Sequence, residues 1–197
     1  MKARLRRPLP DFRQRALTEA LFMSLGDGAI VTDAEAHISR INKKALDILG
    51  FKEKDVLGKW FPEVIIAEDG YGNVLSNTER PIGQVFLTGK TIASRTFYRR
   101  KAGDLIPVDL TISPVMLKGR PAGAIEVFRD ISQTLALERA KDEFVAIASH
   151  QLRTPATAVK QYIGLLLEDY SGSLNDDQRL FLERAYDSNE RQLNIVQ

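Results

Sequence analysis

The chain has 197 residues, 44% hydrophobic and 27% charged, with a formal net charge of +2 at pH 7. These values indicate a globular protein of one or two domains, and the near balance of charge gives no indication of nucleic acid as a partner. The lack of cysteine excludes disulfides, thiolate nucleophiles, cysteine-based zinc sites and cysteinyl cofactor adducts, and no metal site is predicted.

Basic residues gather at the N-terminus, where residues 1–15 hold six lysines or arginines against one acidic residue, Asp11. We interpret residues 1–16 as a solvated basic arm; contact with a membrane surface or nucleic acid is the alternative. No apolar run approaches the ~18 residues of a spanning helix, and the first residues lack the apolar stretch expected of a signal peptide. We therefore expect a cytoplasmic protein, with any membrane segment of a parent protein outside these residues.

Glycine and proline are frequent in residues 24–132 and rare afterwards. This predicts strands and short helices first and long helices later, with the boundary near Asp130. Asn42 is the predicted N-cap of a helix that Gly50 ends, and a second helix is expected around residues 79–88. Strands are predicted at 29–32, 37–41, 92–100, 105–116 and 122–128, with hairpin turns at 102–104 and 118–120. The order indicates an α+β fold with one antiparallel sheet.

Several local markers share this first part of the chain. Asp33 follows the first strand, Asn42 opens a helix that closes with Leu49-Gly50-Phe51, and Val56-Leu57-Gly58 comes next. The triplet Asp130-Ile131-Ser132 ends the last strand. Together these markers resemble a PAS domain over residues 17–132, and the resemblance implies a sensor with a ligand or cofactor held between sheet and helices.

The residues limit which PAS ligand is expected. Without cysteine the domain cannot form the flavin adduct of photosensory members, and residues 76–90 lack the histidine that heme-binding members usually place there. His37 is expected on the surface of an early strand. The ligand stays unknown, and we expect core packing rather than pocket lining for five aromatic residues: Trp60, Phe61, Phe86, Phe97 and Tyr98.

The exit triplet has a local explanation. Asp130 is predicted to cap the following helix by accepting a backbone N–H, with Gln133 at the third position of a capping box. Asp130, Ile131 and Ser132 would then couple the last strand rigidly to the helix and transmit signals between the two parts of the chain.

Residues 133–170 predict one long helix with an apolar stripe. At about 100° per residue, His150 falls opposite the stripe, and Thr154 lies one turn later on the same polar face. The stripe consists of Phe144, Ala148, Leu152, Pro155, Val159, Tyr162, Ile163 and Leu166.

The segment from Lys141 to Ala146, followed by Ser149-His150-Gln151-Leu152-Arg153-Thr154-Pro155, resembles the H-box of sensor histidine kinases. The resemblance implies a signalling linker at 133–143 and a dimerisation and histidine-phosphotransfer (HisKA) domain at 144–197. It makes His150 the phosphoacceptor, which takes the γ-phosphoryl group of ATP and passes it to an aspartate of a response-regulator receiver domain. Imidazole suits this step because it is largely neutral and nucleophilic near pH 7.

Three neighbours of His150 bear on its chemistry. The family often has an acidic general base directly after the histidine, and here that position holds Gln151, whose carboxamide takes up no proton at neutral pH. Thr154 occupies a position that helps to place water for dephosphorylation in the family. Pro155 removes a helical N–H, and a bend is expected there.

A second helix is predicted after a short connection at 171–174. Asn175 is its expected N-cap, with Gln178 at the third position. Its apolar face, interrupted by Asn189 and Gln192, consists of Phe181, Leu182, Ala185, Leu193 and Val196. The two helices form a hairpin, and two copies would bury its stripe in a homodimeric four-helix bundle.

The sequence contains no counterpart of the ATP-binding domain of a histidine kinase. We therefore expect the sensory and phosphoacceptor portion of a kinase, truncated in its second helix and inactive alone. Two alternatives stay open. One is a non-catalytic phosphotransfer and dimerisation adaptor, and the other is a degenerate kinase partner in which Gln151 marks lost activity.

Overall fold

The computed structural model describes residues 11–117, 119–168, 170 and 172–195. The chain divides into two compact units, the first ending at Gln133 and the second beginning at Thr134. The basic residues of the N-terminal ten, Lys118 of the second predicted turn, and Val196 lie outside the described residues.

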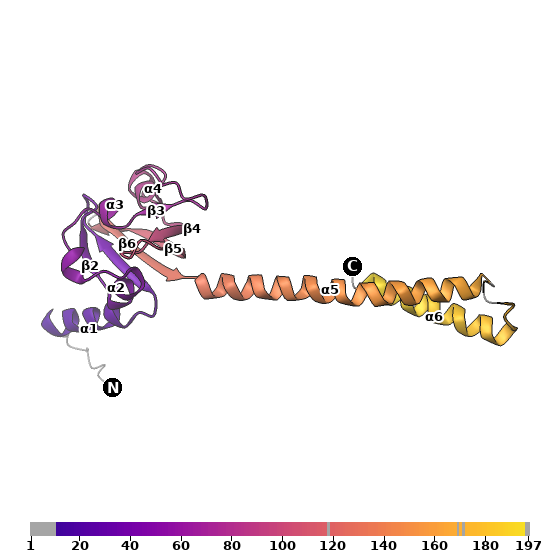
Figure 1. Ribbon diagram of the computed structural model, residues 1–197. Helices are drawn as coiled ribbons and strands as arrows, with labels where there is room; N and C mark the ends of the chain where they lie inside the picture. The colour runs from indigo at the N-terminus through magenta and orange to yellow at the C-terminus, as the bar shows by residue number, and fades with distance from the viewer. Residues whose placement is uncertain (1–10, 118, 169, 171, 196–197) are drawn as a thin grey trace, which may run out of the picture. The chain divides into compact units, whose positions relative to one another are not determined.

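The first unit is built on one sheet of six antiparallel strands in the order β2-β1-β6-β5-β4-β3 (Figure 1). Its strands are β1 (Gly28–Thr32), β2 (Ile38–Ile41), β3 (Ala67–Glu68), β4 (Ile92–Arg99), β5 (Leu105–Leu117) and β6 (Arg120–Asp130). Its helices are α1 (Asp11–Ser24), α2 (Lys43–Leu49), the 3₁₀ turn η1 (Glu53–Asp55), α3 (Phe61–Val64) and α4 (Pro81–Thr88). The predicted α+β class with one antiparallel sheet is confirmed.

Four elements were not predicted: α1, β3 and the short helical segments η1 and α3. Helix α1 crosses residue 16, where the sequence predicts the basic arm to end. Its apolar residues point in several directions, since Phe22 is buried while Phe12, Leu17 and Leu21 are exposed, and such a helix has no clear period. Strand β3 has only two residues, too few for an alternating pattern.

One continuous core lies between the sheet and helices α2, α3 and α4. The helices contribute Ala45, Leu49, Phe61, Ile82 and Val85 to it, among others. The inward residues of the strands complete it: Ile30, Tyr98, Val108, Leu110, Ile112 and Phe128. This core fixes the position of β6, the strand that leads to the second unit.

Asn42 is the predicted N-cap of α2 and holds more than the helix. Its Oδ1 accepts hydrogen bonds from the N–H of Ala45, at 2.8 Å, and of Ala29, at 2.9 Å. Its Nδ2 donates to the carbonyl oxygen of Asp27 at 2.9 Å. The fully buried side chain therefore ties β1 to α2. Gly50 ends α2 in the left-handed conformation, with φ of 74°, as predicted.

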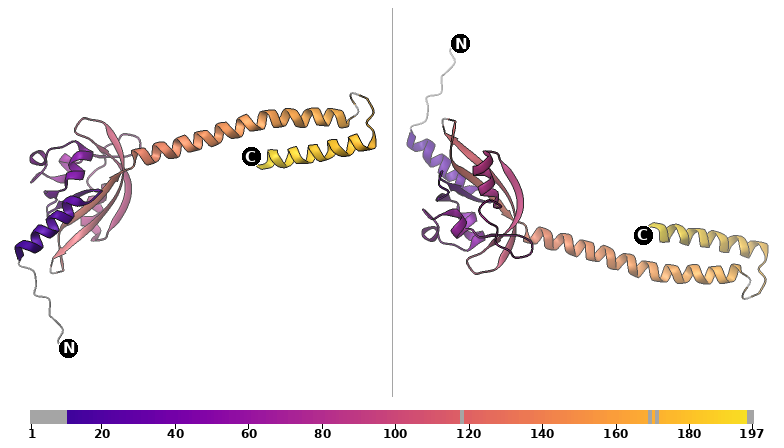
Figure 2. Two further views of the ribbon diagram at one scale, coloured as in Figure 1. Left: turned by 90° about the horizontal axis from the view of Figure 1, so that it is seen from below. Right: turned by 90° about the horizontal axis from the view of Figure 1, so that it is seen from above.

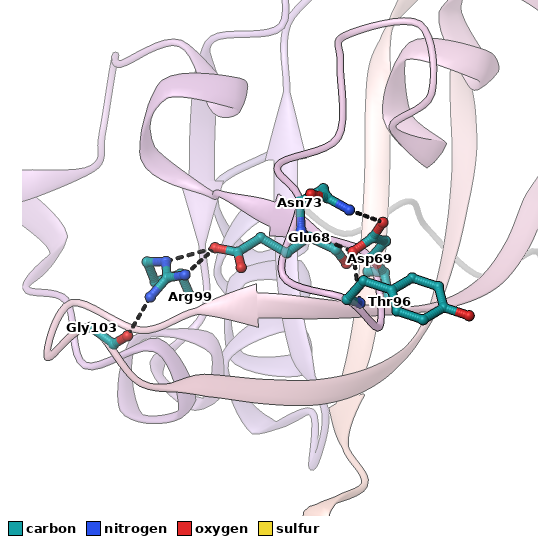
Figure 3. Close-up of polar contacts among 7 residues, drawn as sticks. Glu68, Asp69, Asn73, Thr96, Arg99 and Gly103 are labelled. Carbon is teal, nitrogen blue, oxygen red and sulfur yellow. Dashed lines mark hydrogen bonds and ion pairs between the residues drawn. The ribbon is translucent and has the colours of Figure 1, made fainter.

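A buried carboxylate joins the short strand β3 to β4 (Figure 3). Glu68 is fully buried, and its Oε1 accepts a hydrogen bond from Nε of Arg99 at 2.6 Å. Arg99 also donates to the carbonyl oxygen of Gly103, and the Thr96 hydroxyl donates to the Glu68 carbonyl at 2.8 Å. The second oxygen of Glu68, Oε2, has no hydrogen-bond partner among the described residues. Arg99 is therefore the cation that compensates this buried charge.

Replacing Arg99 with alanine is expected to destabilise the first unit by roughly 3 kcal/mol, because a carboxylate would be left buried without its cation. Denaturant unfolding followed by fluorescence of Trp60, the single tryptophan, measures this. Arg95→Ala is the matched control, since Arg95 is an exposed arginine on β4, and it should change stability by less than about 0.5 kcal/mol. Equal effects of the two variants would contradict the role of Arg99.

The remaining helices are α5 (Ser132–Leu167) and α6 (Asp176–Ile195). Figure 2 shows α6 returning antiparallel beside the C-terminal part of α5. The predicted capping box opens α6: Asn175 Oδ1 accepts from the N–H of Gln178 at 2.8 Å, and Gln178 Oε1 accepts from the N–H of Asn175 at 3.0 Å. The predicted helical hairpin is confirmed. In the described part of the chain, neither of these helices nor any other is long and apolar enough to cross a membrane.

Candidate functional site

His150 lies on α5 with an exposed side chain. No residue of α5 is fully buried, and the predicted apolar stripe is largely open to solvent, with Phe144 71% and Leu152 58% exposed. Val159, Tyr162 and Leu166 of the stripe are exposed as well, while Ala148 and Ile163 are half-buried. The helix thus presents a histidine to solvent and an apolar surface suited to a further helix.

The neighbours of His150 lie as the helix dictates. The Thr154 hydroxyl donates to the backbone carbonyl of His150 at 3.2 Å. Gln151 is exposed beside the histidine. Pro155 lies inside α5, which continues to Leu167. Because proline has no N–H, the carbonyl of Gln151, the residue directly after His150, lacks its usual helical donor.

Lys160, ten residues after His150, connects α5 to α6. Nζ of Lys160 forms an ion pair with Glu190 and lies 5.2 Å from the centre of the Tyr186 ring. The ion pair raises the pKa of Lys160 above its ordinary value. A Cβ on Gly164 would lie 4.0 Å from the Tyr186 ring, an ordinary van der Waals contact, so the ring lies close to this part of α5.

The three residues of the exit triplet lie together at the end of β6. Asp130 Oδ1 accepts from the N–H of Ser132 at 2.8 Å, and its Oδ2 pairs with Arg100 at 2.9 Å. The N–H of Ile131 donates to the carbonyl of Pro107 in β5 at 3.0 Å, and the Ile131 side chain is buried. Burial favours the neutral acid, but the hydrogen bonds from Ser132 and the charge of Arg100 hold the pKa of Asp130 below its ordinary value.

As predicted, Asp130 accepts a backbone N–H at the start of the helix, that of Ser132 two residues ahead of it. Asp130 is also the last residue of β6. The carboxylate still joins the strand to the first turn of the helix.

Besides Glu68, a second acidic residue is buried, on β6, and the sequence analysis did not identify it. Glu126 is 1% exposed, and its Oε1 accepts a hydrogen bond from the Tyr98 hydroxyl at 2.7 Å. Its Oε2 has no hydrogen-bond partner among the described residues. Burial raises the pKa of Glu126 to about 8, although the Tyr98 hydrogen bond favours the charged form. The alternation along β6 could have predicted this burial, because Glu126 lies on the same face of the strand as Ala124 and Phe128.

The aromatic residues predicted as core divide into two groups. Phe61 and Tyr98 are buried, Phe86 packs against the core, and Phe97 is half-buried. Trp60 is 39% exposed, so its prediction as core was wrong. It stands just before α3 and forms an isolated bridge with His37, which is exposed as predicted.

Comparison with known families accounts for both units. A model of the PAS domain matches residues 26–133, which is more than half of the chain. The chain belongs to the PAS domain family. A model of the His Kinase A (phospho-acceptor) domain, HisKA, matches residues 140–197. The PAS domain is thus followed by a HisKA domain, and His150 lies within the second match.

Curated relatives that match most of the chain are named as sensor protein kinases. The chain is 28% identical over 182 residues to the sensor protein kinase WalK of Staphylococcus aureus, a match that covers 90% of this chain and 40% of that one. WalK of Staphylococcus aureus strain JH9 matches with the same identity over 27% of its length. The chain therefore spans less than half the length of these curated relatives.

Solved structures resemble the chain in fold. A PAS domain from Colwellia psychrerythraea is 19% identical with a TM-score of 0.50, covering 63% of this chain and 99% of that one. An RNA-binding light-oxygen-voltage receptor is 13% identical with a TM-score of 0.56, covering 74% of this chain and 41% of that one. At these identities the likeness concerns the fold alone.

Proposed function

We propose that the chain is the sensory and phosphoacceptor portion of a two-component sensor histidine kinase, with His150 as the phosphoacceptor. The observation that carries the proposal is the exposed imidazole of His150 on α5, inside the segment that matches the phospho-acceptor model. A PAS domain directly before it supplies the sensory part.

The proposed reaction is an in-line phosphoryl transfer. A ring nitrogen of His150 attacks the γ-phosphorus of ATP, the bond from that phosphorus to the β–γ bridging oxygen breaks, and ADP leaves. ATP and its Mg²⁺ would be held by a separate ATP-binding domain, whose side chains would stabilise the transferring phosphoryl group. The phosphoryl group then moves from nitrogen to an aspartate carboxylate of a receiver domain. Exposure of His150 gives both partner domains access.

Gln151 and Thr154 modify this chemistry. Gln151 orients the imidazole by hydrogen bonding, and the proton released on attack goes to water, since a carboxamide is no base at neutral pH. Thr154 positions water for removal of the phosphoryl group. Its hydroxyl donates to the His150 carbonyl at 3.2 Å and keeps lone pairs that accept a hydrogen bond from that water.

The alternative is an adaptor or degenerate partner that only modulates another kinase, and Gln151 is the residue that favours it. We would fuse a histidine-kinase ATP-binding domain after Gln197, incubate the protein with γ-labelled ATP, and compare it with Gln151→Glu. The proposal predicts acid-labile, base-stable label in both proteins, with faster labelling of the glutamate variant because it supplies a general base. Label in the glutamate variant alone would favour the alternative that the protein is a degenerate kinase partner.

We further propose that Asp130, Ile131 and Ser132 transmit the signal from β6 to α5. Asp130→Ala removes both the ion pair with Arg100 and the acceptor of the Ser132 N–H. It is expected to weaken the start of α5 by about 1 kcal/mol, seen as faster amide hydrogen exchange at residues 131–136.

Asp104→Ala is the control for this prediction. Asp104 also pairs with Arg100, at 3.3 Å, but its carboxylate is half-exposed and far from α5 in sequence. It should leave exchange at residues 131–136 unchanged. Equal exchange in Asp130→Ala and the unsubstituted protein would contradict the coupling.

A further inference from the structure

Glu126 places a carboxyl group inside the core of the PAS domain, on the strand that leads to α5. Its cross-strand neighbours are Ile30 in β1 and Ile112 in β5, and both are fully buried. The Tyr98 hydroxyl donates to its Oε1, while the chain's own atoms cover its Oε2. A carboxylate in such apolar surroundings is far from water, so the site favours the neutral acid.

The ionisable groups on the elements packed around Glu126 provide no cation for it in the described part of the chain. β1 and α4 contain no ionisable residue. Arg80, directly before α4, donates to three backbone carbonyl oxygens, and its charge acts on Tyr98 rather than on Glu126. Arg99 pairs with Glu68. The other ionisable residues of α2, α3, β4 and β5 are exposed or half-exposed: Lys43, Lys44, Asp47, Glu63, Arg95 and Asp109.

The surroundings of Glu126 therefore set the pH range in which it changes charge. Burial raises its pKa to about 8, and the Tyr98 hydrogen bond opposes this rise only in part. Below that pH the carboxyl group keeps its proton, and above it the proton passes to solvent and leaves a negative charge in the core. Such a charge costs several kcal/mol unless the side chain or its strand moves towards water.

The position of Glu126 in the chain gives this movement a route to the second unit. Glu126 lies four residues before Asp130, the last residue of β6, and α5 begins at Ser132. Asp130 joins the strand to the first turn of the helix through the N–H of Ser132. A displacement of β6 at Glu126 therefore reaches the start of the helix that carries His150.

We propose that Glu126 makes the PAS domain a pH sensor, in which loss of its proton displaces β6 and changes the rate of phosphoryl transfer to His150. The inference rests on the proposed function, because it names the stimulus of that sensor. The described structure, with β6 packed in the core, corresponds to the neutral acid. The anion corresponds to a second state with a loosened β6.

Infrared spectroscopy of the chain tests the charge of Glu126 without any kinase activity. The C=O stretch of a protonated carboxyl group disappears when the group loses its proton. We expect this band at pH 6.5 in the unsubstituted chain and its loss by pH 9, with a midpoint near pH 8. Glu126→Gln should lack the band at both pH values, whereas Glu63→Gln, which alters an exposed carboxylate, should keep it. A chain without the band at pH 6.5 would overturn the proposal.

Labelling by γ-labelled ATP tests the effect on His150 in the chain fused to a histidine-kinase ATP-binding domain. The rate of the unsubstituted protein is divided by that of Glu126→Gln at the same pH, which removes the pH dependence of phosphoryl transfer itself. This ratio is expected to lie near 1 at pH 6.5, because glutamine resembles the neutral acid, and to depart from 1 by about fivefold or more at pH 9. The ratio of Glu63→Gln to the unsubstituted protein should stay constant.

The labelling experiment also separates the pH sensor from the proposed function. Label on His150 with a ratio to Glu126→Gln that stays constant from pH 6.5 to 9 contradicts the sensor and leaves the proposed function standing. No label in any of the proteins at either pH contradicts both. Fluorescence of Trp60 at each pH verifies that the proteins compared are folded.

Discussion

Replacing His150 with alanine is expected to abolish phosphoryl labelling of the chain by ATP in the presence of a histidine-kinase ATP-binding domain. The ring nitrogen of His150 is the proposed nucleophile, and alanine has no group that replaces it. The expected loss is complete, because the step has no second acceptor. The measurement is acid-labile, base-stable label after a timed reaction.

The chain provides its own control for this experiment. It contains two histidines, His37 and His150. His37 is exposed in the PAS domain, with Nδ1 3.6 Å from Oδ1 of Asp33. His37→Ala should keep full labelling. Label that persists in His150→Ala and disappears in His37→Ala would place the phosphoacceptor in the PAS domain and contradict the proposal.

Replacing Glu126 with glutamine is expected to stabilise the PAS domain above neutral pH. Burial holds the pKa of Glu126 near 8, well above its ordinary value of 4.5. The folded state therefore keeps a proton that the unfolded state releases, and stability falls as the pH rises from about 5 through about 8. At about 1.4 kcal/mol per unit of pKa difference, the loss amounts to a few kcal/mol.

Glutamine keeps a hydrogen-bond acceptor for Tyr98 and does not titrate. Melting curves of the Glu126→Gln protein, followed by Trp60 fluorescence from pH 5 to 9, should thus lose most of this pH dependence. Glu63→Gln, which alters an exposed carboxylate on α3, should retain the slope of the unsubstituted protein. A Glu126→Gln protein that is destabilised equally at every pH would contradict a neutral, buried Glu126.

Helix caps were predictable from the sequence where a side chain forms hydrogen bonds with residues close to it in the chain. Asn42 and Gly50 delimit α2, and Asn175 with Gln178 opens α6, because caps depend on residues within one turn. The HisKA segment around His150 was equally easy to recognise from the sequence, since its motif is a continuous run of residues. Asp130 is a further case, since the backbone N–H that it accepts lies only two residues ahead of it.

Burial set by distant parts of the chain was not predictable in the same way. Glu126 meets Tyr98 across 28 residues of sequence, and Glu68 meets Arg99 across 31. Asn189 was identified only as an interruption of an apolar face, because its burial depends on how α6 packs against α5. The burial of these polar side chains depends on partners that are distant in the sequence, so a local pattern does not predict it.

The central claim is that His150 carries the phosphoryl group, and locating that group by mass spectrometry tests it most directly. Cleavage after Lys141 and Arg153 yields one peptide, residues 142–153, which contains Ser149 and His150. Fragmentation by electron transfer at neutral pH, after labelling with ATP, should place the phosphoryl group on His150. A phosphoryl group on Ser149, or in the separate peptide that contains His37, would contradict the account.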